Sequence, residues 1–380
     1  MKILHIGLAS YFTEGMSYQD NELVKQNCID GHEVMYISNA YKYQAGEIVE
    51  TNEEIIQLQC GAILIRLKYI SVINSLITNK FRAVRGLYEI INDFKPDIIL
   101  SHDLCYYSVK DVIKYVQNNS NVKLFVDTHT AGYNSGTNWL SLNILHRCFY
   151  RFLTKKTLPY IRQYLCVGTA EKKFSKEIYG VPEKMMQYWP LGTEIYSDDI
   201  NKKNRSTVRK ELKIGEGQLL FVHSGKLVKE KKTEELLNAF YAVKKIKAKM
   251  IIVGMIPDER RDYLFNLIKR DSRVEFLGWK SGEELRKLLC ASDLYCQPGT
   301  VSATLQNAIG CFSPIMCSNR ETYELLDMGN FLWCSTEQDM KNIFERIASN
   351  EIDINAMRQK SKKCALEMLD YKKLVTVLYS

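Results

Sequence analysis

Short apolar runs alternate with longer amphipathic stretches along the whole chain, and the alternation occurs as two separate series. In the first series the apolar runs lie at 2–9, 34–37, 61–66, 97–100, 123–127 and 163–167. Helical periodicity separates them and predicts helices ending at Cys28 and at about 72–94, 108–117, 140–160 and 170–178. The second series has apolar runs at 218–223, 249–253, 273–277, 293–296 and 314–317. Strands that alternate with helices form parallel sheets covered on both faces, so the sequence predicts an α/β protein with two Rossmann-like domains.

The boundary between the two series is predicted just after Gly192. The polar segment 194–209 follows it and has the composition of an interdomain linker. A chain of 380 residues also fits two domains of roughly 150 to 200 residues each. We therefore expect a first domain at 1–192, a second at 193–365, and a C-terminal helix at 366–380 that packs back on the first domain.

Composition argues against several classes of protein. The eleven cysteines include no C-x-x-C and no zinc-type pairing with histidine, so buried free thiols are expected. No window reaches the ~18 to 20 uncharged apolar residues of a membrane span, and no signal peptide is predicted. The net charge of +8 is spread as +3 over residues 1–190 and +5 over the remainder, so nucleic acid is not an expected partner. The sequence thus predicts a cytoplasmic protein.

The stretch 290–316 is the first candidate ligand site. It predicts a buried strand, a Pro298-Gly299 break, a loop of small residues, a helix through Ile309 and a second buried strand from Pro314. Such a strand, loop and helix present free backbone N–H groups at the carboxyl edge of a sheet, where phosphates and sugars bind. A plain βα turn that binds nothing remains the alternative.

The segment Ser224-Gly225-Lys226 follows a predicted strand, and Lys231 comes soon after it. A flexible glycine turn with converging ammonium groups suits a diphosphate. The spacing is not that of a P-loop, and a solvated lysine face is the alternative interpretation.

Two histidines also follow predicted strands, His102 (next to Asp103) and His129. Both are expected to point from the sheet edge toward bound ligand, although histidines at such positions are often structural. The first βα turn lacks G-x-G-x-x-G, which argues against a hydride-transfer enzyme; Gly15 in that turn can admit a ligand or serve as a turn glycine. Gly278 and Trp279 end another strand, where the indole lies beside a nucleobase or packs in the core. The basic aromatic helix at 147–162 is a candidate contact for anionic lipid, with a solvated helix face as the alternative.

Taken in order, these pieces resemble the retaining glycosyltransferases of family 4. The resemblance spans nearly the whole chain and rests on the opening strand with Gly15, Gly31-His32-Glu33-Val34, His129, Pro190-Leu191-Gly192, Ser224-Gly225-Lys226 with Lys231, Phe276-Leu277-Gly278, and Ala291-Ser292-Asp293-Leu294 with Pro298. It implies the GT-B fold, in which two Rossmann-like domains face each other across a cleft. It also implies that the second domain holds a nucleotide sugar and the first holds the acceptor.

The resemblance also implies roles for individual residues. The catalytic group would be His129, Lys226 and Lys231, with the lysines on the donor diphosphate and the histidine near the donor sugar. The acceptor side would include His102 and Asp103. The donor-binding residues would be Gly15, Ser224, Gly225, Gly278, Trp279, Gly299, Thr300, Ser302, Thr304 and Asn307. No metal and no cofactor are expected, because family members are usually metal-independent and the chain has no Asp-x-Asp motif.

One departure from the family concerns its Glu-x7-Glu pattern, whose positions fall on Gly299 and Asn307 in this chain. Asn307 can still hydrogen-bond a ribose hydroxyl, more weakly than a carboxylate would. At the other position the backbone N–H groups of residues 299–302 remain for the sugar, together with the hydroxyls of Ser302 and Thr304.

The function implied is transfer of a sugar, with retention, from a nucleoside diphosphate onto a glycan or lipid-linked acceptor in surface polysaccharide or glycoconjugate synthesis. A uridine diphosphate donor is expected from its frequency in the family. Two alternatives stay open: a non-catalytic GT-B subunit that binds glycan or a partner transferase, and a sugar-nucleotide epimerase.

Overall fold

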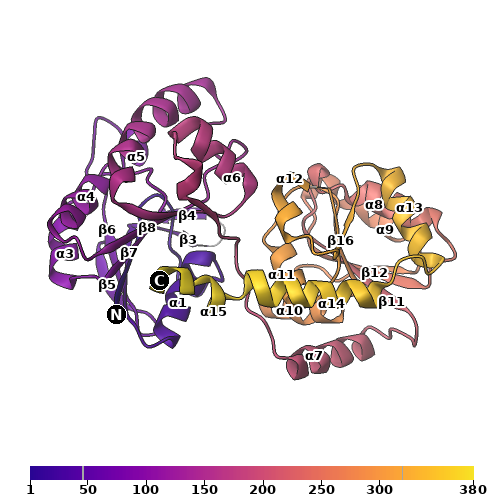
Figure 1. Cartoon of the computed structure of the whole chain (residues 1–380). Coiled ribbons are helices and arrows are strands. Elements are labelled where there is room, and N and C mark those ends of the chain that lie inside the picture. The colour runs from indigo at the N-terminus through magenta and orange to yellow at the C-terminus, as the bar shows by residue number, and fades with distance from the viewer. Residues whose placement is uncertain (45–46, 319) are drawn as a thin grey trace. The chain divides into compact units, whose positions relative to one another are not determined.

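The computed structural model describes residues 1–44, 47–318 and 320–380 and divides the chain into two compact units (Figure 1). Unit 1 comprises Met1–Pro190 together with Leu374–Ser380, and unit 2 comprises Leu191–Lys373. Each unit is built around its own twisted sheet with helices on both faces, as the alternation of strands and helices predicts (Figure 1).

The sheet of unit 1 has the strand order β10-β9-β8-β7-β1-β2-β6-β5 and is parallel except at β5. Its strands are β1 (Lys2–Gly7), β2 (Glu33–Asn39), β5 (Glu54–Gln57), β6 (Ile63–Leu67), β7 (Ile98–His102), β8 (Lys123–Thr128), β9 (Ile161–Cys166) and β10 (Met186–Tyr188). A separate antiparallel pair is formed by β3 (Tyr41–Gln44) and β4 (Glu47–Glu50). The strands that the sequence did not predict, β3, β4, β5 and β10, are short and partly polar, so they lack a continuous apolar run.

Unit 1 has helices along both faces of this sheet. They are α1 (Gln19–Ile29), α2 (Ser75–Phe81), α3 (Leu87–Phe94), α4 (Val109–Asn118), α5 (Arg151–Thr157), α6 (Thr169–Phe174) and α16 (Thr376–Tyr379), with further helical segments at Ser141–Tyr150, Leu158–Tyr160, Ser175–Tyr179 and Glu183–Met185. The single helix predicted at 72–94 is wrong: Arg82 adopts a left-handed conformation (φ 53°) that ends α2, and α3 starts only after Gly86. The basic helix predicted at 147–162 ends earlier, because Ile161 and Arg162 belong to β9.

The sheet of unit 2 is parallel throughout and has the order β13-β12-β11-β14-β15-β16. Its strands are β11 (Leu219–Lys226), β12 (Ala248–Met255), β13 (Val274–Phe276), β14 (Leu294–Gln297), β15 (Ile315–Cys317) and β16 (Phe331–Trp333). Its helices are α7 (Asp198–Glu211), α8 (Thr233–Ala242), α9 (Arg261–Ile268), α10 (Gly282–Ala291), α11 (Thr304–Gly310), α12 (Arg320–Tyr323), α13 (Glu337–Ala348) and α14 (Ile354–Cys364), with helical segments at Lys229–Lys231, Asp258–Arg260, Glu324–Leu326 and Ala365–Leu369. The short helix α15 (Tyr371–Leu374) ends where the chain returns to unit 1.

The polar segment predicted as a linker is instead mostly helix α7. Ser197 caps this helix, and its Oγ accepts a hydrogen bond from the backbone N–H of Ile200. Arg205 and Arg209, one helical turn apart, both pair with the buried carboxylate of Asp293, which also accepts a hydrogen bond from the backbone N–H of Leu220 at 2.7 Å. The charges that suggested a solvated linker therefore fasten α7 to the sheet of unit 2.

The strand orders place one switch point in each unit. From β1 the chain of unit 1 proceeds to β2 and β6 on one side and later to β7, β8, β9 and β10 on the other. In unit 2 the same reversal separates β11 from β14. Loops that leave two adjacent parallel strands in opposite directions open a crevice at their carboxyl ends, which is where open α/β sheets bind ligands.

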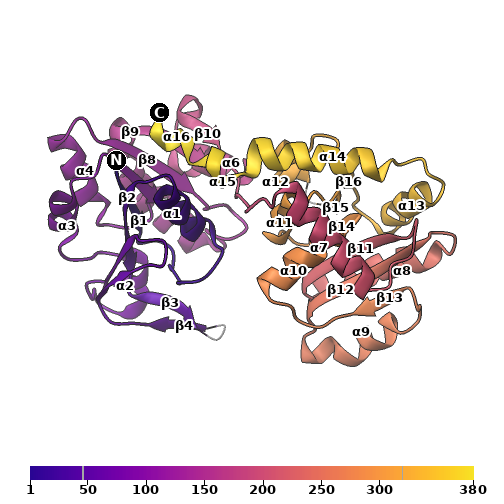
Figure 2. The ribbon, with the colours of Figure 1, turned by 90° about the horizontal axis from the view of Figure 1, so that it is seen from below.

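The last residues of the chain pack on unit 1 (Figure 2, yellow). The indole Nε1 of Trp189 donates to the backbone oxygen of Leu374 at 2.9 Å, and Lys123 donates to the oxygen of Ser380 at 2.8 Å. No helix in the ranges 1–44, 47–318 and 320–380 is long and apolar enough to cross a bilayer.

Candidate functional site

In unit 2 the ends of β11 and β12 approach each other closely at two glycines. Strand β11 ends at Gly225-Lys226 beside Gly254 of β12, and a Cβ added at Gly254 would lie 1.9 Å from the backbone oxygen of Gly225. Gly225 itself has φ 137°, a conformation that favours glycine. The close approach of the two strand ends therefore requires glycine at position 254, and the backbone conformation favours glycine at position 225.

Gly299, just after β14, lies against the loop that carries Glu230 and Lys231. A Cβ added at Gly299 would lie 2.1 Å from the backbone oxygen of Glu230 and 2.6 Å from the Cα of Lys231. The backbone N–H of Thr300 donates to that Glu230 oxygen at 3.2 Å. The glycine is therefore required by direct packing of two backbone segments, a reason that the resemblance did not supply.

Lys231 is a buried cation with a weak protein partner. Its side chain packs against Gly225, its residue is only 7% exposed, and its Nζ donates to the backbone oxygen of Thr300 at 3.4 Å. Burial lowers the pKa of its ammonium group. Within the described part of the chain no carboxylate forms an ion pair with it, whereas Lys226 at the end of β11 is exposed. A buried cation without a counter-ion suits an anionic ligand.

The remaining donor-side residues divide into exposed and engaged groups. Trp279 follows Gly278 (φ 70°) beyond β13 and is 72% exposed, so it does not pack in the core. Ser224 is buried, and its hydroxyl lies 3.0 Å from that of Tyr295. Ser224 therefore links the end of β11 to β14 through a buried hydrogen bond.

The loop after β14 offers fewer free amides than the sequence predicts. The N–H of Ser302 donates to the Tyr323 hydroxyl at 3.0 Å, and the N–H of Thr300 donates to the backbone oxygen of Glu230. The hydroxyls of Ser302 and Thr304 bond to each other at 3.2 Å.

Asn307, on α11, also has a partner within unit 2. Its Oδ1 accepts a hydrogen bond from Thr193 Oγ1 at 2.8 Å. A ribose hydroxyl would have to share this oxygen.

In unit 1 the strand-end histidines have different environments. His102, predicted on the acceptor side, is 2% exposed, and its Nδ1 hydrogen-bonds to Asp127 Oδ2 at 3.0 Å. The His129 side chain is 35% exposed, and its Nε2 lies 3.5 Å from the same Asp127 oxygen. Strand β8 carries Asp127 two residues before His129, which brings one buried carboxylate between the two imidazoles.

This carboxylate controls the charge of both histidines. Burial alone would lower the pKa of His129, but the adjacent Asp127 carboxylate raises it to about 9. Burial likewise opposes ionisation of Asp127, yet the charges of His102 and His129 hold its pKa below the ordinary value. At neutral pH His129 is therefore an imidazolium, a hydrogen-bond donor and not a base.

Asp103 fixes the loop that carries His129. It adopts φ 64°, and its carboxylate accepts hydrogen bonds from Thr128 Oγ1 at 2.7 Å and Thr130 Oγ1 at 3.0 Å. Burial raises the pKa of Asp103.

The other predicted residue of unit 1, Gly15, lies in the loop after β1 with φ 76°. Its neighbour Glu14 pairs with the buried Arg66 at 2.9 Å, which holds that loop to β6.

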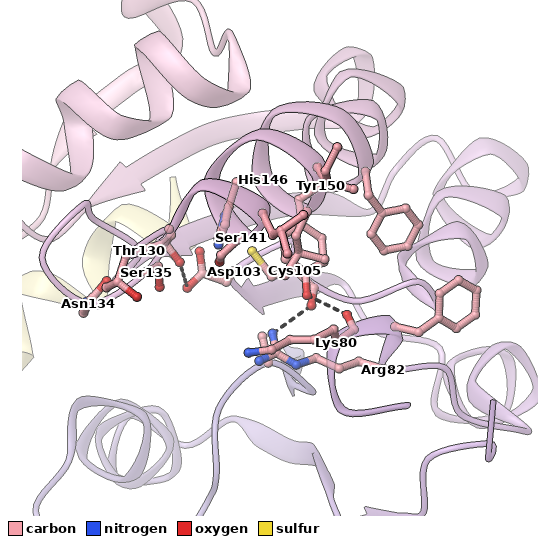
Figure 3. Close-up of a pocket in the computed structure, with 18 of the residues that line it drawn as sticks. Lys80, Arg82, Asp103, Cys105, Thr130, Asn134, Ser135, Ser141, His146 and Tyr150 are labelled. Carbon is pink, nitrogen blue, oxygen red and sulfur yellow. Dashed lines mark hydrogen bonds between the residues drawn. The ribbon is translucent and has the colours of Figure 1, made fainter. Parts of the chain in front are cut away.

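A cavity of about 1260 Å³ opens beside His129 within unit 1 (Figure 3). It lies at the carboxyl ends of β1, β7 and β8, where Ser10, Asp103, His129 and Thr130 line it. Lys80 and Arg82 contribute positive charge, and Figure 3 shows Arg82 bonded to the backbone oxygen of Cys105, a distance of 2.9 Å. The outer part is apolar and exposed, at Leu76, Ile77, Leu140 and Ile144. The cavity can thus accept a molecule with polar and apolar portions.

Sequence reasoning missed Asp127 and two further neighbours of His102. These are Asp20, whose Oδ1 lies 3.5 Å from His102 Nδ1, and His5, whose Nδ1 lies 3.1 Å from His102 Nε2. Asp127 precedes His129 by two residues and thus lies on the same side of the chain, and His5 interrupts the apolar run of the first strand. Both patterns are visible in the sequence, but their meaning depends on which strands are neighbours. No group of three or more His, Cys, Asp and Glu side chains among the described residues is arranged to hold a metal ion.

Two α/β units, each built on a mainly parallel sheet, are the architecture of the GT-B fold. Solved structures confirm the prediction of this fold. HepE from Anabaena in complex with UDP is 14% identical with a TM-score of 0.67, the match covering 100% of this chain and 98% of that one. Sucrose-phosphate synthase from Thermosynechococcus elongatus is 13% identical with a TM-score of 0.67 (100% and 97% covered), and the lipopolysaccharide outer core galactosyltransferase WaaB is 14% identical with a TM-score of 0.63 (100% and 99% covered).

Residues 204–363 match the family model described as glycosyl transferases group 1. That segment lies within unit 2 and includes Lys226, Lys231 and Gly299. The class expected from the sequence, a glycosyltransferase, is the class of this family and of WaaB, which is a galactosyltransferase. No curated protein matches the chain in sequence.

Proposed function

We propose that this protein is a retaining, family-4-type hexosyltransferase that moves a sugar from a nucleoside diphosphate, UDP by preference, onto a glycan or lipid-linked acceptor. The observation that carries the proposal is Lys231, a buried ammonium group of unit 2 that packs against Gly225 at the end of β11. A diphosphate supplies the charge that the protein does not provide there. The nucleotide sugar would bind in unit 2 and the acceptor in the cavity of unit 1.

In this proposal the leaving diphosphate is stabilised by Lys226 and Lys231 without a metal ion. Positive side chains placed where negative charge develops lower the barrier for departure of the nucleotide. HepE, which shares the fold, has been crystallised with UDP and with UDP-glucose, which supports a uridine nucleotide as the donor.

His129 contributes charge to the same step. Because its pKa is raised to about 9, it donates a hydrogen bond and does not accept the proton of the acceptor hydroxyl. That proton would pass to the donor phosphate oxygen as the new glycosidic bond forms on the face from which the nucleotide leaves, which retains the configuration.

A calorimetric titration with UDP, GDP, dTDP and ADP, with and without magnesium, tests the donor assignment. We expect UDP to bind without magnesium, and Lys226→Ala to weaken binding by roughly 10- to 150-fold, the loss of one charged hydrogen bond.

Lys229→Ala is the matched control, because Lys229 is an exposed lysine of the same loop with no assigned contact to the nucleotide. Binding of no diphosphate would instead favour the non-catalytic subunit, and the cavity of unit 1 would then be tested with glycans. If the Lys226→Ala variant bound UDP with the same affinity as the parent, the assignment of Lys226 to the donor site would be wrong.

We also propose that the acceptor is lipid-linked and that unit 1 contacts the cytoplasmic membrane surface. Leu140, Ile144 and Phe152 are exposed along the helical stretch beside the cavity, and Lys155 and Lys156 are exposed near them. Apolar side chains flanked by lysines favour the interface of an anionic bilayer. Arg151, which lies in the helix predicted at 147–162, donates to the backbone oxygen of Ile178 at 2.9 Å.

Vesicle cosedimentation tests the membrane contact. We expect the protein to bind phosphatidylglycerol vesicles more tightly than phosphatidylcholine vesicles, and Leu140→Ser with Ile144→Ser to weaken binding by at least about tenfold through lost apolar burial. Ile55→Ser, an equally exposed substitution on β5 of the same unit, is the control. Identical binding of the double variant and the parent would rule out this surface.

A further inference from the structure

A continuous chain of polar contacts crosses unit 1 from the C-terminal helix to His129. Its members are separated widely in sequence but lie within one unit. The distances are Tyr379 Oη to Asp30 Oδ2 2.7 Å, Asn27 Nδ2 to Tyr379 Oη 2.8 Å, Asn27 Oδ1 to His5 Nε2 2.8 Å, His5 Nδ1 to His102 Nε2 3.1 Å, His102 Nδ1 to Asp127 Oδ2 3.0 Å, and His129 Nε2 to Asp127 Oδ2 3.5 Å.

The middle of this chain is shut off from water. His5, Asn27 and Asp127 are fully buried, and His102 is nearly so. A buried polar group that is left without its hydrogen bond destabilises the fold. Each member must therefore donate where its neighbour accepts. The donor and acceptor of every hydrogen bond in the series can then be assigned by starting from its outer end, at Tyr379.

At the outer end the direction is set by Asp30. A carboxylate only accepts, so the Tyr379 hydroxyl donates its single proton to Asp30 and its oxygen accepts from the Asn27 amide nitrogen. This orients the Asn27 oxygen toward His5, and His5 must donate from Nε2.

The tautomer of His5 then fixes the charge of His102. Burial and the nearby His102 lower the pKa of His5 to about 4, so His5 is neutral and its Nδ1 accepts a proton from His102 Nε2. His102 Nδ1 faces the Asp127 carboxylate and must carry a proton as well. With both nitrogens protonated, His102 is an imidazolium.

The surroundings of His102 agree with a positive charge. Burial opposes it, but Asp127 and Asp20, whose Oδ1 lies 3.5 Å from Nδ1, outweigh burial and raise the pKa of His102. The Tyr36 hydroxyl donates to the other oxygen of Asp20 at 2.6 Å, and the Tyr36 ring stacks on His102. His129 is a like charge that lowers the pKa of His102, and it has Asp20 and Asp103 as further acidic neighbours besides Asp127.

We propose that Tyr379, through Asn27 and His5, holds His102 as a buried cation that shares Asp127 with His129, so that the C-terminal helix positions the histidine of the candidate active site. Only the assignment of His129 to that site rests on the proposed function. Tyr379, Asn27, His5, His102 and Asp127 are positioning residues, because none of them needs to touch a substrate.

Loss of the Tyr379 hydroxyl has a defined consequence. The Asn27 amide nitrogen loses its acceptor, and rotating the amide by half a turn lets it donate to His5 Nε2. His5 then donates from Nδ1, and His102 keeps only the proton that it shares with Asp127. Asp127 is left with one cationic neighbour, so His129 holds its own proton more tightly.

Nuclear magnetic resonance of protein labelled with ¹³C and ¹⁵N in histidine tests this inference directly. In the parent we expect both ring nitrogens of His102 to be protonated at neutral pH. In Tyr379→Phe we expect loss of that imidazolium signature and a titration midpoint of His129 at higher pH. In Asp127→Asn the midpoint should fall, because the neighbouring negative charge is gone.

Tyr371→Phe is the matched control, since this tyrosine of the same C-terminal segment bonds to the backbone oxygen of Gly192 outside the chain of contacts. Tyr379→Phe keeps the ring that packs on His32, so folding should persist, and circular dichroism checks it. A neutral His102 in the parent, or unchanged His102 and His129 signals in Tyr379→Phe, would overturn the inference.

Because these spectra need neither donor nor acceptor, they separate this inference from the proposed function. Once turnover is measured, the alkaline limb of the pH profile of kcat should move with the His129 midpoint in Tyr379→Phe, with KM for the donor unchanged. If the histidine spectra were as expected but the protein bound no nucleotide, the proposed function would be refuted and the inference about Tyr379 and His102 would still hold.

Discussion

Replacing Lys231 by methionine is expected to abolish most nucleotide affinity while making the free protein more stable. Methionine fills a similar volume but removes the charge that is buried beside Gly225 and Thr300. We expect the dissociation constant for UDP to rise by roughly 10- to 150-fold. We also expect the free energy of unfolding of the ligand-free protein to rise by about 0.5 to 2 kcal/mol, because an unpaired charge no longer has to be desolvated.

The stability difference should depend on pH in one direction. Burial lowers the folded-state pKa of Lys231 below its value in the unfolded chain, so folding favours the neutral amine. The cost of burying the charge is full below the folded pKa and disappears above the ordinary lysine value. The stabilisation by Lys231→Met is therefore largest at neutral pH and decreases as the pH rises toward the lysine range.

Thermal unfolding at several pH values and calorimetry with UDP measure both effects on one sample. Lys229→Met is the control, because the side chain of Lys229 is exposed and its charge is already hydrated. If the variant bound UDP as tightly as the parent, Lys231 would not belong to the donor site. A variant that is less stable at every pH would show that the ammonium group has a structural partner.

The second large effect is expected at Gly299, the position of the first family glutamate. Any side chain there meets backbone, because its Cβ would lie 2.1 Å from the Glu230 oxygen and 2.6 Å from Lys231 Cα. We expect Gly299→Ala to cost about 1 to 3 kcal/mol in unfolding free energy through overpacking. Because the displaced segment carries Lys231, UDP affinity should fall as well.

Gly299→Glu is the informative partner of this variant. If the missing carboxylate were the only difference between this loop and the family pattern, the substitution would strengthen binding of a UDP-sugar. We expect weaker binding, since the loop has no room for a side chain. Gly282→Ala, at a helical position where an added Cβ meets nothing within 4 Å, provides the control for replacing glycine as such. Tighter binding by Gly299→Glu than by the parent would contradict this account.

The strands that carry the candidate site follow from local sequence. The apolar runs before Gly225, His102 and His129 are continuous and buried on both faces of a parallel sheet, so their ends could be located without tertiary information. Helix α7 shows where this fails: its charged residues indicate a linker until Arg205 and Arg209 are seen to meet Asp293, more than eighty positions away.

The sequence alone therefore determined the two α/β series, the glycine-lysine turn at 225–226 and the two strand-end histidines, because periodicity and turn chemistry act over a few neighbouring residues. The tertiary structure alone decided which of these groups meet. It buried His102 and left His129 partly exposed, and it packed Gly299 against the backbone of Lys231. It also brought Tyr379 to Asn27, a contact between residues 352 positions apart. Such contacts follow from strand order and from the return of the C-terminus to unit 1, which depend on packing of the whole chain.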